Sequence, residues 1–385
     1  MNKIIKNKKG IYIHIPFCKY ICSYCDFNKF YIQHQPVDEY IKYLIKEIQN
    51  IKDKNEIETV YIGGGTPSAL NDGQLVLLLN AVSQVVDINQ LREFSFEANP
   101  EDLTLDKVNI LKKFGINRVS MGVQTLNDEL LKVIGRGHKE SDVENAILNL
   151  KLVGIKNINV DLMFSLPNQT MEDLYLTMKK IISYDIPHIS CYSLILEQRT
   201  KLYNQVKNKH VILPTNEVEE KMYSAVIDYL TNNGFTQYEV SNFSKKGYES
   251  IHNTNYWKNF EYYGFGAGAH GYIDGVRYSN HGPVKFYIDS MKKNGHARKE
   301  ITQVSKKEKI EEEFFLGLRL LSGINLLEID KKYNINSREI YMNSIESNIS
   351  KNFLSLENNI IKLTYKGLFY GNDVFSDFII ISENE

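Results

Sequence analysis

Short runs of β-branched and aromatic residues alternate with longer amphipathic stretches through the first half of the chain. The strand-like runs cover residues 11–15, 59–62, 93–97, 118–122, 158–164 and 188–194, and the helix-like stretches cover 37–51, 72–86, 105–114, 141–153 and 171–184. Strands that alternate with helices favour βαβ units and a parallel sheet. Repeated units of this kind predict an α/β fold, a partial (β/α)6 barrel.

Proline follows four of the strand-like runs closely, at Pro16, Pro67, Pro100 and Pro167. Because proline cannot continue a hydrogen-bonded ladder, these positions indicate where strands end. Loops at the carboxyl ends of the strands build the active sites of β/α barrels. The residues that stand out in these loops are a cysteine cluster, a triple glycine at 63–65, Asn99 and Asn168.

The pattern changes after about Pro214. A helix is expected over 217–232, and residues 248–283 are rich in Tyr, Gly, His and Asn but have little periodicity. After Ser305 the order is helix, helix, hairpin, helix, with Asn358-Asn359 as the hairpin turn and Thr364 as a helix cap. We therefore predict a barrel domain at 1–215, an α/β extension at 216–300, and a helical, winged-helix-like C-terminal domain at 301–385.

Composition limits the partners of this chain. It has 385 residues with 46 basic and 47 acidic side chains, a formal net charge of −1. This balance creates no field that would attract nucleic acid, so the C-terminal domain is interpreted as a structural or docking module rather than a DNA reader. The basic residues 1–10 lack the apolar core of a signal peptide, and no stretch approaches the ~18 apolar residues that span a bilayer. We expect a soluble, cytosolic protein.

Three of the four cysteines, Cys18, Cys22 and Cys25, lie within eight residues with the spacing C-x3-C-x2-C. Crowded thiols in a cytosolic chain indicate metal ligands rather than disulfides. Three thiolates can hold a [4Fe-4S] cluster and leave one iron open. That iron can chelate the amino and carboxylate groups of S-adenosylmethionine, whose reductive cleavage gives a 5′-deoxyadenosyl radical. The alternative is structural zinc, with Cys191 or a histidine as fourth ligand; otherwise Cys191 is an inert core residue.

A series of motifs gives a more specific indication. In order, they are HIPFC at 14–18, GGGTPS at 63–68, EANP at 97–100, GVQ at 122–124, GRGH at 135–138, NVDL at 159–162, LPNQT at 166–170 and HNTNYW at 252–257. In this order the chain resembles the radical S-adenosylmethionine superfamily. More closely, it resembles the HemW heme chaperones, relatives of HemN, the oxygen-independent coproporphyrinogen III oxidase.

The resemblance implies a set of residues around S-adenosylmethionine. Glycines let the backbone approach the ligand, the planar fork of Arg136 suits a carboxylate, and Asp161 suits ribose hydroxyls. The implied cofactor-binding residues are Tyr12, Tyr24, Gly64, Gly65, Thr66, Glu97, Gln124, Arg136 and Asp161. No residue is given a catalytic role.

Two departures from the oxidases favour a chaperone. The oxidases carry a fourth cysteine two residues after the third cluster ligand, where this chain has Phe27, and they have a longer arm before the first strand. In HemW proteins a stretch like His252-Asn253-x-x-Tyr256-Trp257 is linked to heme, which makes His252 the candidate heme ligand and His270 a second one. A packed core histidine is the structural alternative.

The expected function is therefore heme binding and transfer to an acceptor hemoprotein, which could be a membrane protein. The expected cofactors are a [4Fe-4S] cluster, S-adenosylmethionine and heme, with an electron donor of the flavodoxin or ferredoxin type. Two alternatives stay open at this point: radical decarboxylation of coproporphyrinogen III, and a zinc-stabilised scaffold without redox chemistry.

Overall fold

The computed structural model describes residues 9–52 and 54–379 of the 385-residue chain. Most of the basic segment that argued against a signal peptide, residues 1–8, lies outside the described residues. None of the helices in the described ranges combines the length and the apolar character that crossing a bilayer requires.

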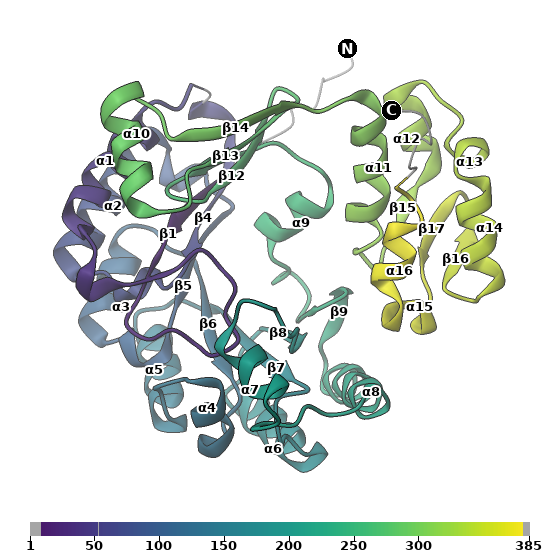
Figure 1. The fold of residues 1–385 in the computed structure, drawn as a ribbon, viewed down its shortest axis with the longest axis horizontal. Coiled ribbons are helices and arrows are strands. Elements are labelled where there is room, and N and C mark those ends of the chain that lie inside the picture. Colours follow the sequence, from purple (N-terminus) through teal and green to yellow (C-terminus); the bar gives the residue numbers. More distant parts are fainter. Residues whose placement is uncertain (1–8, 53, 380–385) are drawn as a thin grey trace.

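Six parallel neighbouring strands form the centre of one large sheet (Figure 1). They are β1 (Lys9–Ile15), β4 (Ile57–Gly64), β5 (Glu93–Ala98), β6 (Arg118–Gln124), β7 (Asn157–Phe164) and β8 (His188–Ser193). The helices between them are α1 (Val37–Gln49), α2 (Asp72–Val85), α3 (Leu105–Lys113), α4 (Asp128–Ile134), α5 (Glu140–Leu152) and α6 (Met171–Ser183). The predicted partial (β/α)6 barrel is confirmed, because each strand-like run forms a strand and the helices follow in the expected order.

The two faces of the central strands differ in chemistry. Successive side chains of a strand point to opposite faces, and one face is apolar and fully buried in the main core: Ile11, Ile13, Val60, Ile62, Phe94, Phe96, Val119, Met121, Ile158 and Val160. The alternate positions carry buried polar side chains, among them Thr59, Glu93, Ser95, Arg118, Ser120, Asn159, His188 and Ser190. The apolar face packs against the helices, so the polar face lines the interior of the barrel.

The second half of the chain extends the same sheet at both edges. β11 (Tyr262–Phe265) pairs parallel with β1, and β12 (His270–Ile273), β13 (Val276–Asn280) and β14 (Arg298–Gln303) continue it antiparallel. At the other edge β10 (Asn242–Ser244) and β9 (Thr236–Glu239) follow β8. The helices of this region are α7 (Lys201–Lys207), α8 (Asn216–Asn232), α9 (Ile251–Trp257) and α10 (Val284–Asn294).

Residues 248–283, where the sequence has little periodicity, are part of this extension. The segment forms α9 and three strands of the main sheet. The strands have four or five residues each and are separated by glycine-containing turns. Elements this short give no measurable period of either 2 or 3.6 residues.

The C-terminal part is a small helical unit with a three-stranded sheet. It contains α11 (Lys306–Gly317), β15 (Ile324–Asn325), α12 (Leu326–Tyr333), α13 (Ser337–Ile340), α14 (Met342–Ser350), β16 (Leu354–Glu357), β17 (Ile360–Leu363), α15 (Tyr365–Phe369) and α16 (Gly371–Ser376). Asn358 and Asn359 form the hairpin turn with φ of 52° and 63°, the left-handed conformation that such turns need. The Thr364 side chain caps α15 by accepting from the Gly367 N–H. The winged-helix-like order is confirmed, whereas the boundaries at 215 and 300 stay predictions.

Candidate cofactor site

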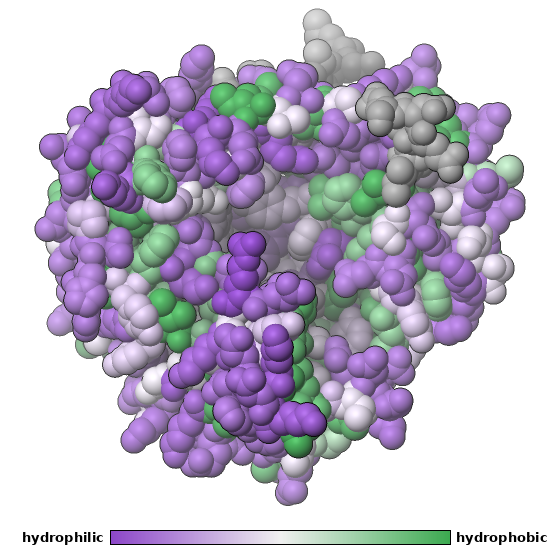
Figure 2. Space-filling view, viewed as in Figure 1, coloured by the Kyte–Doolittle hydropathy of each residue, from purple (hydrophilic) through white to green (hydrophobic). Residues whose placement is uncertain are grey.

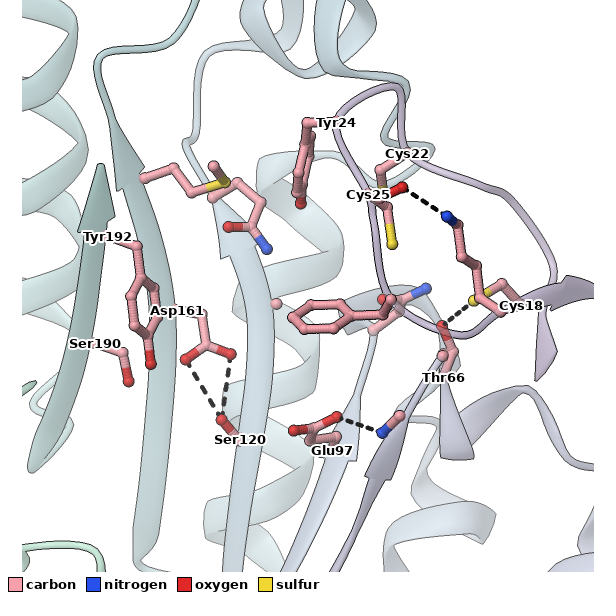
Figure 3. Close-up of a pocket in the computed structure, with 18 of the residues that line it drawn as sticks. Cys18, Cys22, Tyr24, Cys25, Thr66, Glu97, Ser120, Asp161, Ser190 and Tyr192 are labelled. Carbon is pink, nitrogen blue, oxygen red and sulfur yellow. Dashed lines mark hydrogen bonds between the residues drawn. The ribbon is translucent and has the colours of Figure 1, made fainter. Parts of the chain in front are cut away.

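A cavity of about 530 Å³ opens at the carboxyl ends of the parallel strands (Figure 3). Its lining includes Cys18, Cys22 and Cys25 together with all but one of the residues that the sequence analysis assigned to S-adenosylmethionine: Tyr24, Gly64, Gly65, Thr66, Glu97, Gln124, Arg136 and Asp161. The exception, Tyr12, does not line the cavity. Its hydroxyl forms a hydrogen bond of 2.9 Å with Nδ1 of His14.

The cysteine loop is fixed by its own β-pairing and by backbone hydrogen bonds to two other segments. Two short strands, β2 (Phe17–Cys18) and β3 (Phe30–Tyr31), close the loop on itself. In its middle, the Ser23 N–H donates to the Ile134 carbonyl at 2.9 Å, and the Ser23 carbonyl accepts from the Leu202 N–H at 2.8 Å. The loop is therefore held between the end of α4 and the start of α7.

Asn28 anchors the same loop to the β11–β12 turn and to the chain that follows β13. Its amide donates to the Ala267 and Gly282 carbonyls at 2.8 and 2.9 Å, and its own carbonyl pairs with Nε2 of His14 at 2.8 Å. A Cβ on Gly268 would lie 2.6 Å from the Asn28 amide nitrogen. Close packing on the cysteine loop thus explains the glycine at 268. His270 in the same stretch is exposed.

Two of the three thiols accept hydrogen bonds from neighbouring side chains. Cys18 Sγ accepts from the Thr66 hydroxyl at 3.3 Å, and Cys22 Sγ accepts from Arg136 Nη1 at 3.5 Å. Burial raises the pKa of Cys18 to about 11 and also raises that of Cys25. These thiols are therefore protonated without a metal, and iron would have to displace the protons. A Cβ on Gly65 would lie 2.9 Å from Cys18 Sγ, so only glycine leaves room beside this sulfur.

These surroundings fit an iron-sulfur cluster better than structural zinc. In the described ranges, no three His, Cys, Asp or Glu side chains converge on a point where one metal ion could sit, whereas in a cluster each thiolate binds a separate iron. The histidine that the zinc alternative would use as fourth ligand is not among the cavity-lining residues. Cys191 is buried in the apolar core and lines a different cavity.

Arg136 is a buried cation on the cysteine side of the cavity, where Lys29 also lines the wall. Its Nη2 donates to the Asn99 side chain at 3.0 Å and to the Gly122 carbonyl, while its buried Nε has no hydrogen-bond partner. Burial opposes the charge, but the neighbouring Cys22 and Tyr24 outweigh it and raise the pKa of Arg136. A permanent charge with a free donor suits a ligand carboxylate.

Two carboxyl groups lie away from the thiols (Figure 3). Glu97 accepts from the Gly64 N–H at 3.0 Å and from the Tyr61 hydroxyl at 2.6 Å. Asp161 accepts from Ser120 at 3.2 Å and from the Asn159 amide at 2.7 Å. Burial raises the pKa of Glu97 to about 7 and also raises that of Asp161. A cationic or hydroxyl-bearing ligand in the cavity would compensate these buried groups.

Gln124 reaches the cavity through a local irregularity of the sheet. Its φ is 69°, in the left-handed region, and the pairing of β6 with β7 shifts register between Gly122 and Gln124. Such a bulge redirects a side chain at a strand end.

The sequence analysis missed several lining residues, which are Arg118, Ser120, Asn159, Ser190, Tyr192 and Asn253. All but Asn253 occupy inward positions of parallel strands. Their signal was available: polar residues recur at every second position within strands that are otherwise apolar, and a fully buried parallel strand should lack them. Asn253 gave no such signal, because its place in the cavity depends on how α9 packs.

His252 on α9 is closed to ligands in this conformation. It is buried, its Nδ1 pairs with the Thr59 hydroxyl at 2.8 Å, and its Nε2 pairs with the Tyr256 hydroxyl at 2.8 Å. Its ring stacks on Tyr61 at 5.2 Å. Burial, with a smaller contribution from Arg118, lowers the pKa of His252 to about 3, so the ring is neutral. Of the two residues in the His-Asn pair, it is Asn253 that lines the cofactor cavity.

Trp257 joins α9 to the C-terminal part of the chain. The Arg319 guanidinium lies 4.5 Å from the centre of its ring. A second cavity of about 640 Å³ lies beside this contact, between β8, α8 and the α15–α16 region, and Tyr192, Ser193 and Ile195 line both cavities. Figure 2 shows the hollow on this face of the molecule, with hydrophobic side chains along its wall.

Comparison with known proteins agrees with this geometry. The family model of the radical SAM superfamily matches residues 12–181, and that of the HemN C-terminal domain matches residues 304–370. The heme chaperone HemW of Bacillus subtilis is 44% identical over 96% of this chain and 99% of its own length. The HemW of Lactococcus lactis is 42% identical over 98% of this chain and 99% of its own length.

Among solved structures, coproporphyrinogen III oxidase (HemN) from Escherichia coli superposes with a TM-score of 0.84. The match covers 97% of this chain and 90% of the oxidase at 21% sequence identity. At this level of identity the likeness establishes the fold.

Proposed function

The chain belongs to the HemW family of radical SAM proteins, and on this basis we propose that it binds heme and transfers it to acceptor hemoproteins. Membership of the radical SAM superfamily supports a [4Fe-4S] cluster and S-adenosylmethionine as cofactors. We assign the cluster to Cys18, Cys22 and Cys25. An electron donor of the flavodoxin or ferredoxin type, an acceptor in or at a membrane, and a cytosolic location complete the proposal.

The observation that carries the cofactor assignment is the common lining of one cavity. Three thiols lie on one side of it, and Glu97 and Asp161 lie away from them (Figure 3). S-adenosylmethionine has a carboxylate and an amine at one end and ribose hydroxyls at the other. We propose that Arg136 and the Gly64–Thr66 backbone hold the methionine end near the open iron, with Asp161 at the ribose. Bound there, the cofactor pair would supply radical chemistry.

The choice of chaperone over oxidase depends on the HemW relatives and on Phe27. This side chain lines the cavity where the oxidases have a fourth cysteine, and it is exposed. His252 stays the sequence-based candidate for the heme iron. That role requires breaking the hydrogen bond to Thr59 or the one to Tyr256.

The test uses anaerobically reconstituted protein in two parallel assays. We expect heme titration to give a defined Soret band at a fixed stoichiometry, and the heme to move to an apo-hemoprotein on mixing. We expect no conversion of coproporphyrinogen III in the presence of S-adenosylmethionine and reductant. Rapid conversion would assign the chain to the oxidases, and the absence of saturable heme binding would reject the chaperone.

A further inference from the structure

Asp102 is a buried carboxylate close to the cofactor cavity to which the sequence motifs give no role. It ends one short helical turn, Pro100–Asp102, which follows β5, and its side chain is 1% exposed. Asp102 does not line the cavity, but it accepts hydrogen bonds from two segments whose other residues do. The Lys19 ammonium donates to Oδ1 at 2.5 Å, and the Ser68 hydroxyl donates to Oδ2 at 2.7 Å.

One series of hydrogen bonds connects Asp102 to Arg136. The Ser68 hydroxyl, which donates to Asp102, accepts from the Asn99 N–H at 3.1 Å. The Asn99 side-chain oxygen then accepts from Arg136 Nη2 at 3.0 Å. Asn99 and Arg136 line the cavity, whereas Ser68 is fully buried and does not. Because Ser68 and Asn99 are each bonded on both sides, the position of Arg136 depends on the carboxylate at the end of the series.

The other oxygen of Asp102 connects it to the cysteine loop. Lys19 directly follows Cys18, the first of the three candidate cluster ligands. The chain that leaves the triple glycine is fixed in the same region, because the Lys107 ammonium donates to the carbonyls of Ser68 and Leu70 at 2.6 and 2.7 Å. The carboxylate therefore joins the cysteine loop, the glycine segment and the buried arginine, which are the parts assigned to the methionine end of the ligand.

Stability alone does not account for a carboxylate in this place. Removal of a carboxylate from water costs free energy, and an ion pair with the half-exposed Lys19 recovers only part of it. A buried group that orients ligand-binding side chains acts differently, since its loss lowers the affinity for the ligand even where the fold survives.

We propose that Asp102 is a positioning residue for S-adenosylmethionine. Through Ser68 and Asn99 it holds the Arg136 guanidinium in place, and through Lys19 it fixes the cysteine loop relative to that cation. The inference rests on the proposed assignment of the cluster and S-adenosylmethionine to this cavity, and it adds a residue that touches neither.

The test is a titration of the reduced, anaerobically reconstituted protein with S-adenosylmethionine, followed by the change in the [4Fe-4S] EPR signal. Asp102→Ala removes both acceptor oxygens, so we expect the apparent Kd to rise roughly tenfold or more while the iron content is retained. Ser68→Ala breaks only the series to Arg136 and should weaken binding severalfold. Because both changes interrupt the same series, the double variant should bind no more weakly than Asp102→Ala alone.

Glu312→Ala on α11 is the matched control. The Glu312 side chain is 4% exposed and pairs with Arg277, which is 42% exposed, much as Asp102 pairs with the 46% exposed Lys19. Glu312 lines neither cavity, so its loss should cost stability in urea but leave the affinity for S-adenosylmethionine unchanged.

The outcomes separate this inference from the cofactor assignment. If the unchanged protein shows no EPR change with S-adenosylmethionine, the proposed cofactor assignment itself fails. If that change is present but Asp102→Ala binds the ligand normally, or Glu312→Ala weakens binding as much, the positioning role is wrong. Multiplied effects in the double variant would also overturn it. If Asp102→Ala yields no folded protein, Ser68→Ala decides alone, and an unchanged affinity there rejects the inference.

Discussion

The cysteine loop and helix α9 contain the two sets of residues that most resemble ligand sites in the sequence. In the folded protein the cysteine loop faces a cavity, whereas the candidate ligand on α9 is bonded to other side chains. In the loop, three thiols face a cavity and the buried Nε of Arg136 has no partner. In α9, both ring nitrogens of His252 are hydrogen-bonded to other side chains. A cysteine cluster can be recognised as a site from its spacing, but a histidine has to be judged by its partners.

The difference has a physical basis in where the two segments lie in the barrel. The cysteine loop lies at the carboxyl ends of the strands, where loops diverge and leave space. Helix α9 contacts the other ends: Glu93, the first residue of β5, accepts from the Ile251 N–H at 2.6 Å, and Thr59 near the start of β4 holds His252. α9 therefore closes the barrel interior at the amino ends of the strands. Its polar residues satisfy buried strand positions, and only Asn253 reaches the cavity.

The largest expected effect tests the cysteine loop at the carboxyl ends of the strands. Cys22→Ser should abolish the [4Fe-4S] EPR signal and most of the bound iron after anaerobic reconstitution, because two thiols hold a cluster poorly. Cys191→Ser is the matched control, since this buried thiol lies in the core rather than at the site. It should keep its iron. Equal iron loss in both variants would mean that the loss reflects general unfolding.

The next effect tests helix α9 at the other ends of the strands. His252→Ala removes two buried hydrogen bonds and a stacked ring, so we expect the free energy of unfolding in urea to fall by about 2–4 kcal/mol. The exposed His270→Ala should change it by less than about 0.5 kcal/mol. Iron content should be retained in both. Unchanged stability together with lost heme binding would instead make His252 an open ligand and remove the contrast between the two regions.

These two regions also show what the sequence could predict. The barrel order followed from alternating patterns, and the cavity-lining role of Gly64, Glu97 and Asp161 agrees with the motif positions at strand ends. The cavity-lining role predicted for Tyr12 was not found, because its hydroxyl is hydrogen-bonded to His14. The anchoring hydrogen bonds of Asn28 could not be predicted from the sequence either, because their acceptors are more than 200 residues away in the chain. Local patterns carry periodicity and spacing, but not which buried polar groups satisfy one another.

The pH dependence of the free energy of unfolding measures what the buried carboxyl group of Glu97 costs the ligand-free protein. Burial raises the pKa of Glu97 from 4.5 to about 7. The folded protein therefore holds this proton more tightly than the unfolded chain does, and stability falls as the pH rises from about 4.5 to 7. Without cofactors, the protein should be less stable in urea at pH 8 than at pH 5. Glu97→Gln should reduce this loss by roughly 2–3 kcal/mol, whereas Glu300→Gln at an exposed site should leave it unchanged. An equal loss in the Glu97 variant would contradict the role of this carboxyl.

The smallest effect tests whether α9 is also fixed from outside the barrel. The Arg319 guanidinium lies 4.5 Å from the Trp257 ring centre, and a partly desolvated contact of this kind contributes about 1 kcal/mol. Arg319→Met keeps the apolar stem but removes the charge, so it should lower the free energy of unfolding by about that amount. Arg298→Met provides the matched control, because Arg298 lies 4.2 Å from the ring centre of Tyr278 on β13 rather than over Trp257 on α9. Trp257 is the only tryptophan of the chain, so its emission reports on α9 directly. A shift of that emission with Arg319→Met but not with Arg298→Met would show that the C-terminal part helps to keep α9 closed. If both variants leave the emission unchanged, α9 is held by the barrel alone.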